Sequence, residues 1–233
     1  MNTLFWFFRF VALPCLLAGN SLCMVLAAAP PDTAVTIRAL TILDAQKQTV
    51  APADFVAELA RQRIVFIGEQ HDQYRQHLNQ LAVIRALHEK APDRWALAME
   101  FFQQPFQTVL DDYGSDRITE HDMLRDSEYF ERWRYDYRLY QPIVRYAHSA
   151  GIPMIALNID RDVHRLTGQY GLDNLSPEQR ALLPEQIDQT DADYRDRLKA
   201  IYALHLPSDN PDSDDNIADT DPGFERFWQA QLV

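Results

Sequence analysis

The chain has 233 residues, of which 47% are hydrophobic and 24% charged, a composition typical of a globular domain and not of a disordered or fibrous protein. Its formal net charge at pH 7 is −12, and no cluster of Lys and Arg offsets this charge. A surface of that sign repels phosphate backbones, so the sequence predicts no nucleic-acid partner.

The N-terminus has the pattern of an export signal. Arg9 is followed by an almost unbroken apolar run at 10–29 that ends in small residues, which predicts a signal peptide over residues 1–29. The alternative is an uncleaved membrane anchor, because the run is close to the ~20 residues that span a bilayer. We expect an exported protein in the periplasm or associated with a membrane of the cell envelope. Both cysteines, Cys15 and Cys23, lie in this segment, so the mature chain would have none.

The rest of the chain, residues 30–233, alternates between strand-like and helix-like segments. Residues 35–43 are rich in β-branched side chains and predict an edge strand or hairpin arm. A helix is expected from Pro52, with Asp54 as its N-cap. Three short apolar runs predict parallel strands buried on both faces: 64–67, 95–99 and 152–157. Helices are predicted between or beside them, at 74–90, 105–113, 119–130 and 141–149.

This order predicts an α/β domain with a mostly parallel sheet and flanking helices. Residues 167–206 are polar and helical and predict a small helical cap over the sheet, followed by an exposed acidic loop at 207–222. Phe224 and Trp228 then share one face of a last helix, and the chain stops soon after it. Because three strands make a thin sheet, we expect the chain to be truncated at its C-terminus relative to a longer protein.

Polar side chains follow each of the three apolar runs. Glu69 and His71 come after the first, Glu100 after the second, and Asn158 with Asp160 after the third. In open α/β sheets, sites form outside the carboxyl ends of the strands, so these residues are predicted to line one crevice.

Two chemistries suit this set. Glu69, His71 and Glu100 could bind a divalent metal with an activated water, or act as acid and base without a metal. His77 lies six residues after His71, near the start of the next helix, and could face the same crevice. The structural alternative is that Glu69 stabilises a helix N-terminus while the histidines are ordinary packed residues.

The segment 129–146 is rich in aromatic residues and arginines. Its aromatic members are Tyr129, Phe130, Trp133, Tyr135, Tyr137, Tyr140 and Tyr146. They could simply pack on the sheet, and for Trp133 we favour that interpretation. Tyrosines beside arginines could also bind a flat anionic ligand, because a phenolate can ligate ferric haem and an arginine can pair with a propionate.

Three blocks of the sequence resemble the ChaN family of haem-binding uptake proteins. They are RIVFIGEQHD at 63–72 with His77, ALAMEFFQQ at 96–104, and YQPI at 140–143 followed by IPMIALN at 152–158. The similarity runs from about residue 63 to 233. That family belongs to the wider Tiki/TraB and erythromycin-esterase-like group, some of whose members are metal-dependent peptidases or esterases.

The resemblance implies an envelope protein that binds haem through tyrosine, sometimes as a stacked pair at a dimer interface, and that is linked to iron acquisition. It supports Glu69, His71, His77 and Glu100 as the shared pocket. Family members are often lipoproteins, and they usually continue to further strands and a second Gly-His motif, which again implies a truncated chain.

We therefore expect a haem-binding protein of the cell envelope that serves iron uptake, with haem and a second copy of the chain as partners. The predicted haem contacts are His77, Tyr135, Tyr137, Tyr140 and Asn158. One alternative is a metal-dependent hydrolase that uses Glu69, His71 and Glu100 as catalytic residues and metal ligands. A second alternative is a binding module without a cofactor.

Overall fold

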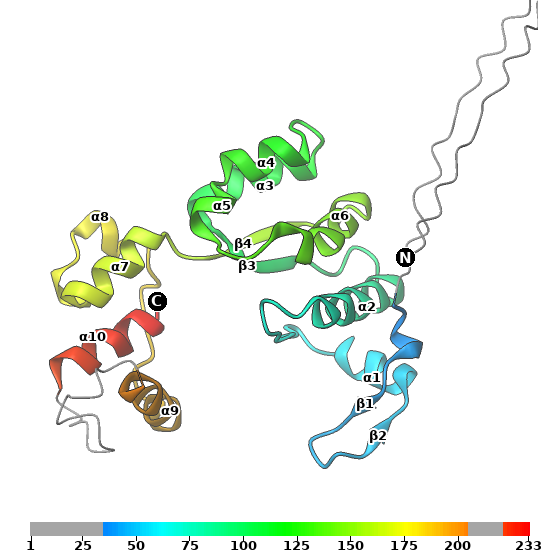
Figure 1. Ribbon diagram of the computed structural model, residues 1–233, viewed down its shortest axis with the longest axis horizontal. Helices are drawn as coiled ribbons and strands as arrows, with labels where there is room; N and C mark the ends of the chain where they lie inside the picture. Colours follow the sequence, from blue (N-terminus) through cyan, green and yellow to red (C-terminus); the bar gives the residue numbers. More distant parts are fainter. Residues whose placement is uncertain (1–34, 205–220) are drawn as a thin grey trace, which may run out of the picture. The chain divides into compact units, whose positions relative to one another are not determined.

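The computed structural model describes residues 35–204 and 221–233 (Figure 1). The chain divides into two units, Met1–Thr33 and Ala34–Val233, and all described residues belong to the second. The predicted signal peptide and most of the predicted acidic loop therefore lie outside the described residues. Within the described ranges, no helix is long and apolar enough to cross a membrane.

The described chain is mostly helical, with two small sheets (Figure 1). The strands are β1 (Ile42–Leu43), β2 (Thr49–Val50), β3 (Leu97–Gln103) and β4 (Met154–Asn158). The first six α-helices are α1 (Pro52–Leu59), α2 (Tyr74–Lys90), α3 (Gln107–Gly114), α4 (Glu120–Asp126), α5 (Tyr129–Arg132) and α6 (Gln141–Ser149). The last four are α7 (Arg161–Tyr170), α8 (Pro177–Arg180), α9 (Ala192–Ala203) and α10 (Pro222–Gln231). Short 3₁₀ turns occur at Ile37–Ala39, Gln104–Phe106, Tyr137–Leu139 and Leu172–Asn174.

The N-terminal hairpin only partly matches its prediction. A 3₁₀ turn occupies Ile37–Ala39, so strand β1 is limited to the end of the predicted segment, where it pairs with β2 in antiparallel fashion. Helix α1 starts at Pro52 as predicted, but its N-cap is Ala51 and not Asp54. Proline suits the first helical position because that position needs no N–H donor, and Asp54 lies in the first turn, where a negative charge is favourable.

Strands β3 and β4 form the parallel sheet, and helices flank it, so the predicted α/β class is confirmed (Figure 1). Leu97 pairs with Met154 and Met99 with Ala156, and the register shifts between Met99 and Gln103. Strand β3 also runs further than predicted. Glu100 is therefore inside the strand and does not follow its end.

The prediction that these strands are buried on both faces is wrong. Met99, Met154 and Ala156 are buried in the core, which α3 to α6 complete, whereas the alternate residues of both strands are exposed. The exposed positions are Ala98, Glu100, Ile155 and Leu157. Successive strand residues point to opposite faces, and these positions show that only one face is packed.

The side chain of Gln107 occupies the outer edge of β4. Its amide donates from Nε2 to the carbonyl of Met154 at 2.9 Å and accepts at Oε1 from the N–H of Ala156 at 2.8 Å. A side-chain amide thus takes the place that the backbone of a further strand would have.

The first predicted strand, 64–67, is wrong as well: this segment is extended but pairs with no described strand. Val65 and Ile67 pack against the apolar cluster formed by α1 and α2, whereas Ile64 is 68% and Phe66 89% exposed. The carbonyl of Ile67 accepts instead from the side chain of Gln80, at 2.9 Å. Helix packing on one side and a side-chain partner therefore replace a strand ladder here.

Helices α7, α9 and α10 pack together around their own apolar cluster. Phe224 and Trp228 of α10 are fully buried there with Leu198, which confirms the predicted apolar face of the last helix. The predicted cap at 167–206 contains α8, α9 and the end of α7. That it covers the sheet, and that further C-terminal strands are missing, stay predictions.

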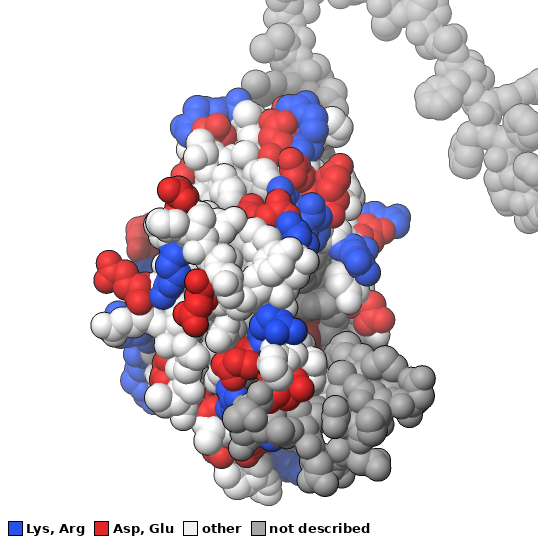
Figure 2. Space-filling model, turned by 90° about the vertical axis from the view of Figure 1, so that its left-hand side faces the viewer, with Lys and Arg blue, Asp and Glu red and all other residues white. Residues whose placement is uncertain are grey.

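Acidic and basic side chains are interspersed over the face of the protein shown in Figure 2, without a basic patch on that face. Many arginines pair with carboxylates of the same chain, as Arg132 does with Glu128 at 2.8 Å and Arg145 with Glu120 at 2.6 Å. Pairing of this kind lowers the local positive charge that a nucleic acid would need.

Candidate functional site

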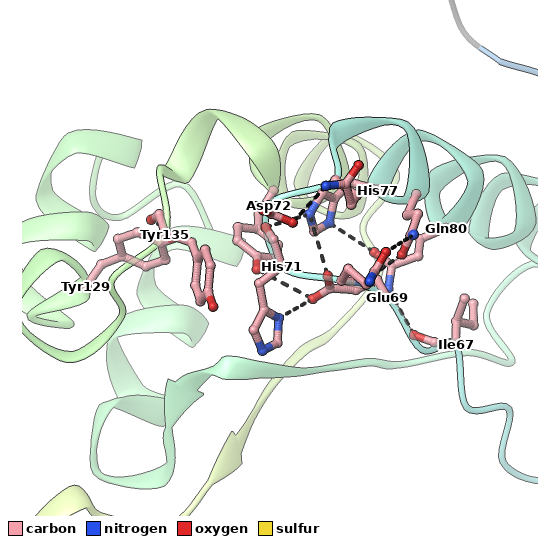
Figure 3. A network of polar contacts seen from close by, with 12 residues as sticks. Ile67, Glu69, His71, Asp72, His77, Gln80, Tyr129 and Tyr135 are labelled. Carbon is pink, nitrogen blue, oxygen red and sulfur yellow. Dashed lines mark hydrogen bonds and ion pairs between the residues drawn. The ribbon is translucent and has the colours of Figure 1, made fainter. Parts of the chain in front are cut away.

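Glu69 lies at the centre of a polar network in the loop that leads into α2 (Figure 3). Its side chain is only 10% exposed, and Oε1 lies 2.6 Å from Nδ1 of His71. The other oxygen, Oε2, lies 3.8 Å from Nε2 of His77. The sequence prediction that Glu69, His71 and His77 meet at one place is therefore confirmed.

His77 holds this loop from within the protein. It belongs to the first turns of α2 and is 1% exposed. Its Nε2 lies 3.1 Å from the carbonyl of His71, and its Nδ1 lies 3.3 Å from Oε1 of Gln80, which also donates to Ile67. The contacts of α2 thus fix the backbone on both sides of Glu69, and His77 has no open side for a large ligand.

Two rings from the aromatic segment lie against His71 (Figure 3 shows Tyr135). The centroid of the His71 ring is 4.9 Å from that of Trp133, edge to face, and 4.7 Å from that of Tyr135. Trp133 is in extended conformation after α5, so residues 133 and 135 point to the same side. Trp133 packs against the apolar core, as expected from the sequence, and also contacts His71, which the spacing of 133 and 135 could have indicated.

Tyr140 closes the inner side of the network. It is 2% exposed, its hydroxyl lies 3.5 Å from Oε1 of Glu69, and its ring lies 4.5 Å from that of His77 and 4.3 Å from that of Phe101. Burial raises the pKa of Tyr140, and the charges of Glu69 and Glu100 raise it further. Its phenol therefore stays protonated near neutral pH.

One buried polar atom of the site, Oε2 of Glu69, makes no hydrogen bond within the described part of the chain. The side chain of Trp133 interacts with the hydroxyl of Tyr140 and lowers its pKa, against the larger effect of burial. A buried polar atom without a partner costs about 1–3 kcal/mol, and such atoms are few in folded proteins. Its presence beside His71 is what a site that completes its contacts with a ligand or a water would show.

The other predicted site residues are placed elsewhere. Tyr137 is buried and donates its hydroxyl to Oε1 of Glu120 at 2.8 Å, and burial raises its pKa. Glu100 is exposed within β3, and Asn158 is the half-buried last residue of β4. Among the described residues, none of the three makes a hydrogen bond or ion pair with Glu69 or His71.

The divalent-metal alternative gains no support from this geometry. Within the ranges that the structure describes, no three His, Cys, Asp or Glu side chains are arranged so that they could hold a metal ion together. That alternative requires Glu100 to lie together with Glu69 and His71, and these three residues form no such group.

The sequence matches one protein family over most of its length. Residues 55–233 match the family described as "Haem-binding uptake, Tiki superfamily, ChaN". The chain belongs to the ChaN family. This confirms the resemblance inferred from the three sequence blocks, all of which lie within the matched range. A comparison with curated proteins gives no match.

A solved structure of a ChaN protein has a similar fold. It is described as "Cofacial heme binding to ChaN of Campylobacter jejuni", and it superposes with a TM-score of 0.60 at 14% sequence identity. The match covers 80% of this chain and 68% of that one. At this identity the likeness shows the fold alone.

Proposed function

We propose that this protein binds haem and takes part in iron uptake in the cell envelope. The observation that carries the proposal is the contact between the ChaN-family motif and the aromatic segment, in which His71 lies against Trp133 and Tyr135. Membership of a family of haem-binding uptake proteins supports the same ligand. The signal-like sequence at 1–29 supports the envelope location.

The residues present fit haem. A porphyrin is flat, aromatic and largely apolar, and the rings of His71, Trp133 and Tyr135 offer matching surface. Haem, when bound, would supply a ferric iron that a phenolate can coordinate. Among the predicted tyrosines, Tyr135 is 36% exposed, whereas Tyr137 is 4% and Tyr140 is 2% exposed. We therefore assign the iron ligand to Tyr135.

The other residues of the site hold this surface in place. A carboxylate can only accept, so the contact at 2.6 Å means that Nδ1 of His71 carries a hydrogen and donates it to Glu69. His77 and Gln80 fix the loop, and Tyr140 closes the space behind Glu69. The binding surface is thus preorganised before haem arrives.

A hemin titration followed by visible absorption tests the proposal. We expect a saturable, shifted Soret band with charge-transfer features of a ferric phenolate. Tyr135→Phe should abolish those features and weaken binding at least tenfold, whereas Tyr137→Phe should leave both unchanged, because that hydroxyl bonds to Glu120. If the unaltered protein shows no saturable hemin binding, the proposal is wrong, and the cofactor-free binding module becomes the better interpretation.

We also propose that the chain forms a homodimer. Ile64, Phe66, Ile155 and Leu157 are large apolar side chains that are exposed in the single chain, and such residues commonly mark an association surface. Sedimentation velocity of the protein with and without hemin tests this proposal. Phe66→Ser should shift the population towards monomer, and an unchanged sedimentation profile would contradict a role for this residue.

A further inference from the structure

The two halves of the site come from segments that are far apart in the sequence. Glu69 and His71 belong to the loop before α2, whereas Trp133 and Tyr135 follow α5. The rings of His71 and Trp133 lie 4.9 Å apart, edge to face. A hydrogen bond is more directional than a ring contact, so a polar link between the two segments would hold both rings at defined angles.

Tyr140 is the residue that contacts both segments. It is the N-cap residue of α6 and is 2% exposed. The centroid of its ring lies 4.3 Å from that of Phe101 in β3 and 4.5 Å from that of His77 in α2. These contacts hold the phenol from two sides, so its hydroxyl has a defined place behind the site.

The hydroxyl of Tyr140 reaches Glu69. It lies 3.5 Å from Oε1, the oxygen that also accepts from Nδ1 of His71 at 2.6 Å. A carboxylate oxygen only accepts, so the phenol is the donor in this contact. The carboxylate of Glu69 is thereby held between two donors, one from its own loop and one from the aromatic segment.

The same hydroxyl interacts with Trp133. Nε1 of Trp133 is buried, and an indole N–H only donates, so the phenol oxygen of Tyr140 is the acceptor. The pKa of Tyr140 reflects both neighbours: burial raises it most, the indole of Trp133 lowers it, and Glu69 raises it. These directions are the ones that a donor and an acceptor at a phenol produce.

We propose that Tyr140 is a positioning residue that couples the two halves of the site through one directed chain of hydrogen bonds. The chain runs from the indole of Trp133 to the phenol of Tyr140 and on to Glu69, where it meets the hydrogen that His71 donates. The phenol has a single hydrogen, so it cannot turn away from Glu69 without breaking the chain. The effect on haem affinity rests on the proposed function, whereas the chain itself belongs to the ligand-free protein.

Tyr140→Phe keeps the ring and removes the hydroxyl alone. In a hemin titration we expect about tenfold weaker binding, as for a group that orients another binding residue, with the charge-transfer bands retained because Tyr135 is unchanged. Tyr137→Phe is the matched control, because it removes a buried hydroxyl of the same segment whose partner is Glu120. Unchanged affinity of Tyr140→Phe overturns the proposal. Loss of the bands also overturns it, because Tyr140 would then bind the iron itself.

A double variant shows whether Tyr140 acts through Glu69. Glu69→Ala and Tyr140→Phe break the same contact, so the double variant should bind hemin only slightly more weakly than Glu69→Ala alone. Effects that multiply to about a hundredfold would show that the two residues act independently, and would overturn the proposal.

A measurement without hemin separates the coupling from the haem function. In a proton–nitrogen correlation NMR spectrum, the indole signal of Trp133 is the one that Trp133→Phe removes. It should shift in Tyr140→Phe and stay in place in Tyr137→Phe. In the unaltered protein, this indole proton should show a nuclear Overhauser effect to the Tyr140 ring, which keeps the test decisive if Tyr140→Phe folds poorly.

The two failures are therefore distinguishable. If the unaltered protein does not bind hemin but both NMR results hold, the haem function is wrong and the coupling stands. If the Overhauser effect is absent, or the indole signal does not move in Tyr140→Phe, the coupling is wrong whatever the hemin titration shows.

Discussion

His71 and Glu69 are two residues apart in sequence and are joined by a hydrogen bond of 2.6 Å between Nδ1 and Oε1. The bond fixes the ring, which lies against the aromatic pair Trp133 and Tyr135. Groups that orient another group in this way affect binding through geometry, without touching the ligand themselves.

The first prediction concerns this orientation. Glu69→Ala should lower hemin affinity about tenfold, in line with the effect of removing a carboxylate that orients a histidine. The charge-transfer bands should keep their character, because Tyr135 is unchanged. Glu58→Ala removes an exposed carboxylate of α1 and serves as the control. Equal affinities of the Glu69 variant and the unaltered protein would refute the orienting role.

The second prediction concerns the edge of β4. Gln107→Leu removes two hydrogen bonds to backbone groups of Met154 and Ala156, so we expect a loss of about 1–3 kcal/mol in the free energy of unfolding. Urea denaturation followed by circular dichroism measures this loss. Gln62→Leu, at an exposed position after α1, should change stability by less than about 0.5 kcal/mol. Similar losses in both variants would show that the Gln107 bonds contribute nothing.

The third prediction is a dependence of stability on pH. The folded-state pKa of Glu120 is lower than its usual value of 4.5, so its contribution is complete above that pH and is lost as the pH falls towards the folded-state value. Urea unfolding between pH 6 and pH 3 should therefore show a smaller acid-induced loss for Glu120→Gln than for the unaltered protein. Identical pH profiles would mean that the bonds from Arg145 and Tyr137 do not stabilise the folded state.

The fourth prediction concerns the C-terminal helices. Trp228 is fully buried, so Trp228→Ala should lower the free energy of unfolding by about 3–5 kcal/mol. Trp228→Phe should cost clearly less, because the indole Nε1 makes no hydrogen bond within the described residues and its removal breaks none. Leu204→Ala, at a position that is 84% exposed, is the control. Equal losses for the Ala and Phe variants would contradict a packing role for the ring.

Much of the fold followed from periodicity and from residues that start or stop helices. The long helix at 74–90 and the helix at 141–149 were predicted with the bounds that the structure has, because apolar spacing and proline define them locally. The segment 64–67 was not predictable in this way. An apolar run indicates burial but does not state how many faces are covered, and Phe66 is exposed because no described element packs over it.

The part of the site that depends on local sequence was predicted, and the part that depends on tertiary packing was not. Glu69, His71 and His77 lie within nine residues of each other, so their convergence depends on local geometry. The choice among Tyr135, Tyr137 and Tyr140 depends on which hydroxyl reaches the surface, and only tertiary packing decides that. Tyr137 turns inward to Glu120, a partner seventeen residues earlier that no motif marks.

The side-chain amide of Gln107 leaves the small parallel sheet with one edge, that of β3, at which a further strand could pair. With the carbonyl of Met154 and the N–H of Ala156 already bonded, β4 is a closed border, whereas β3 pairs with a strand on one side only within the described chain. A peptide that adds to this sheet by main-chain pairing would therefore align with β3. An additional strand engineered into this protein should therefore be placed beside β3, because the outer backbone groups of Met154 and Ala156 in β4 are already bonded to Gln107.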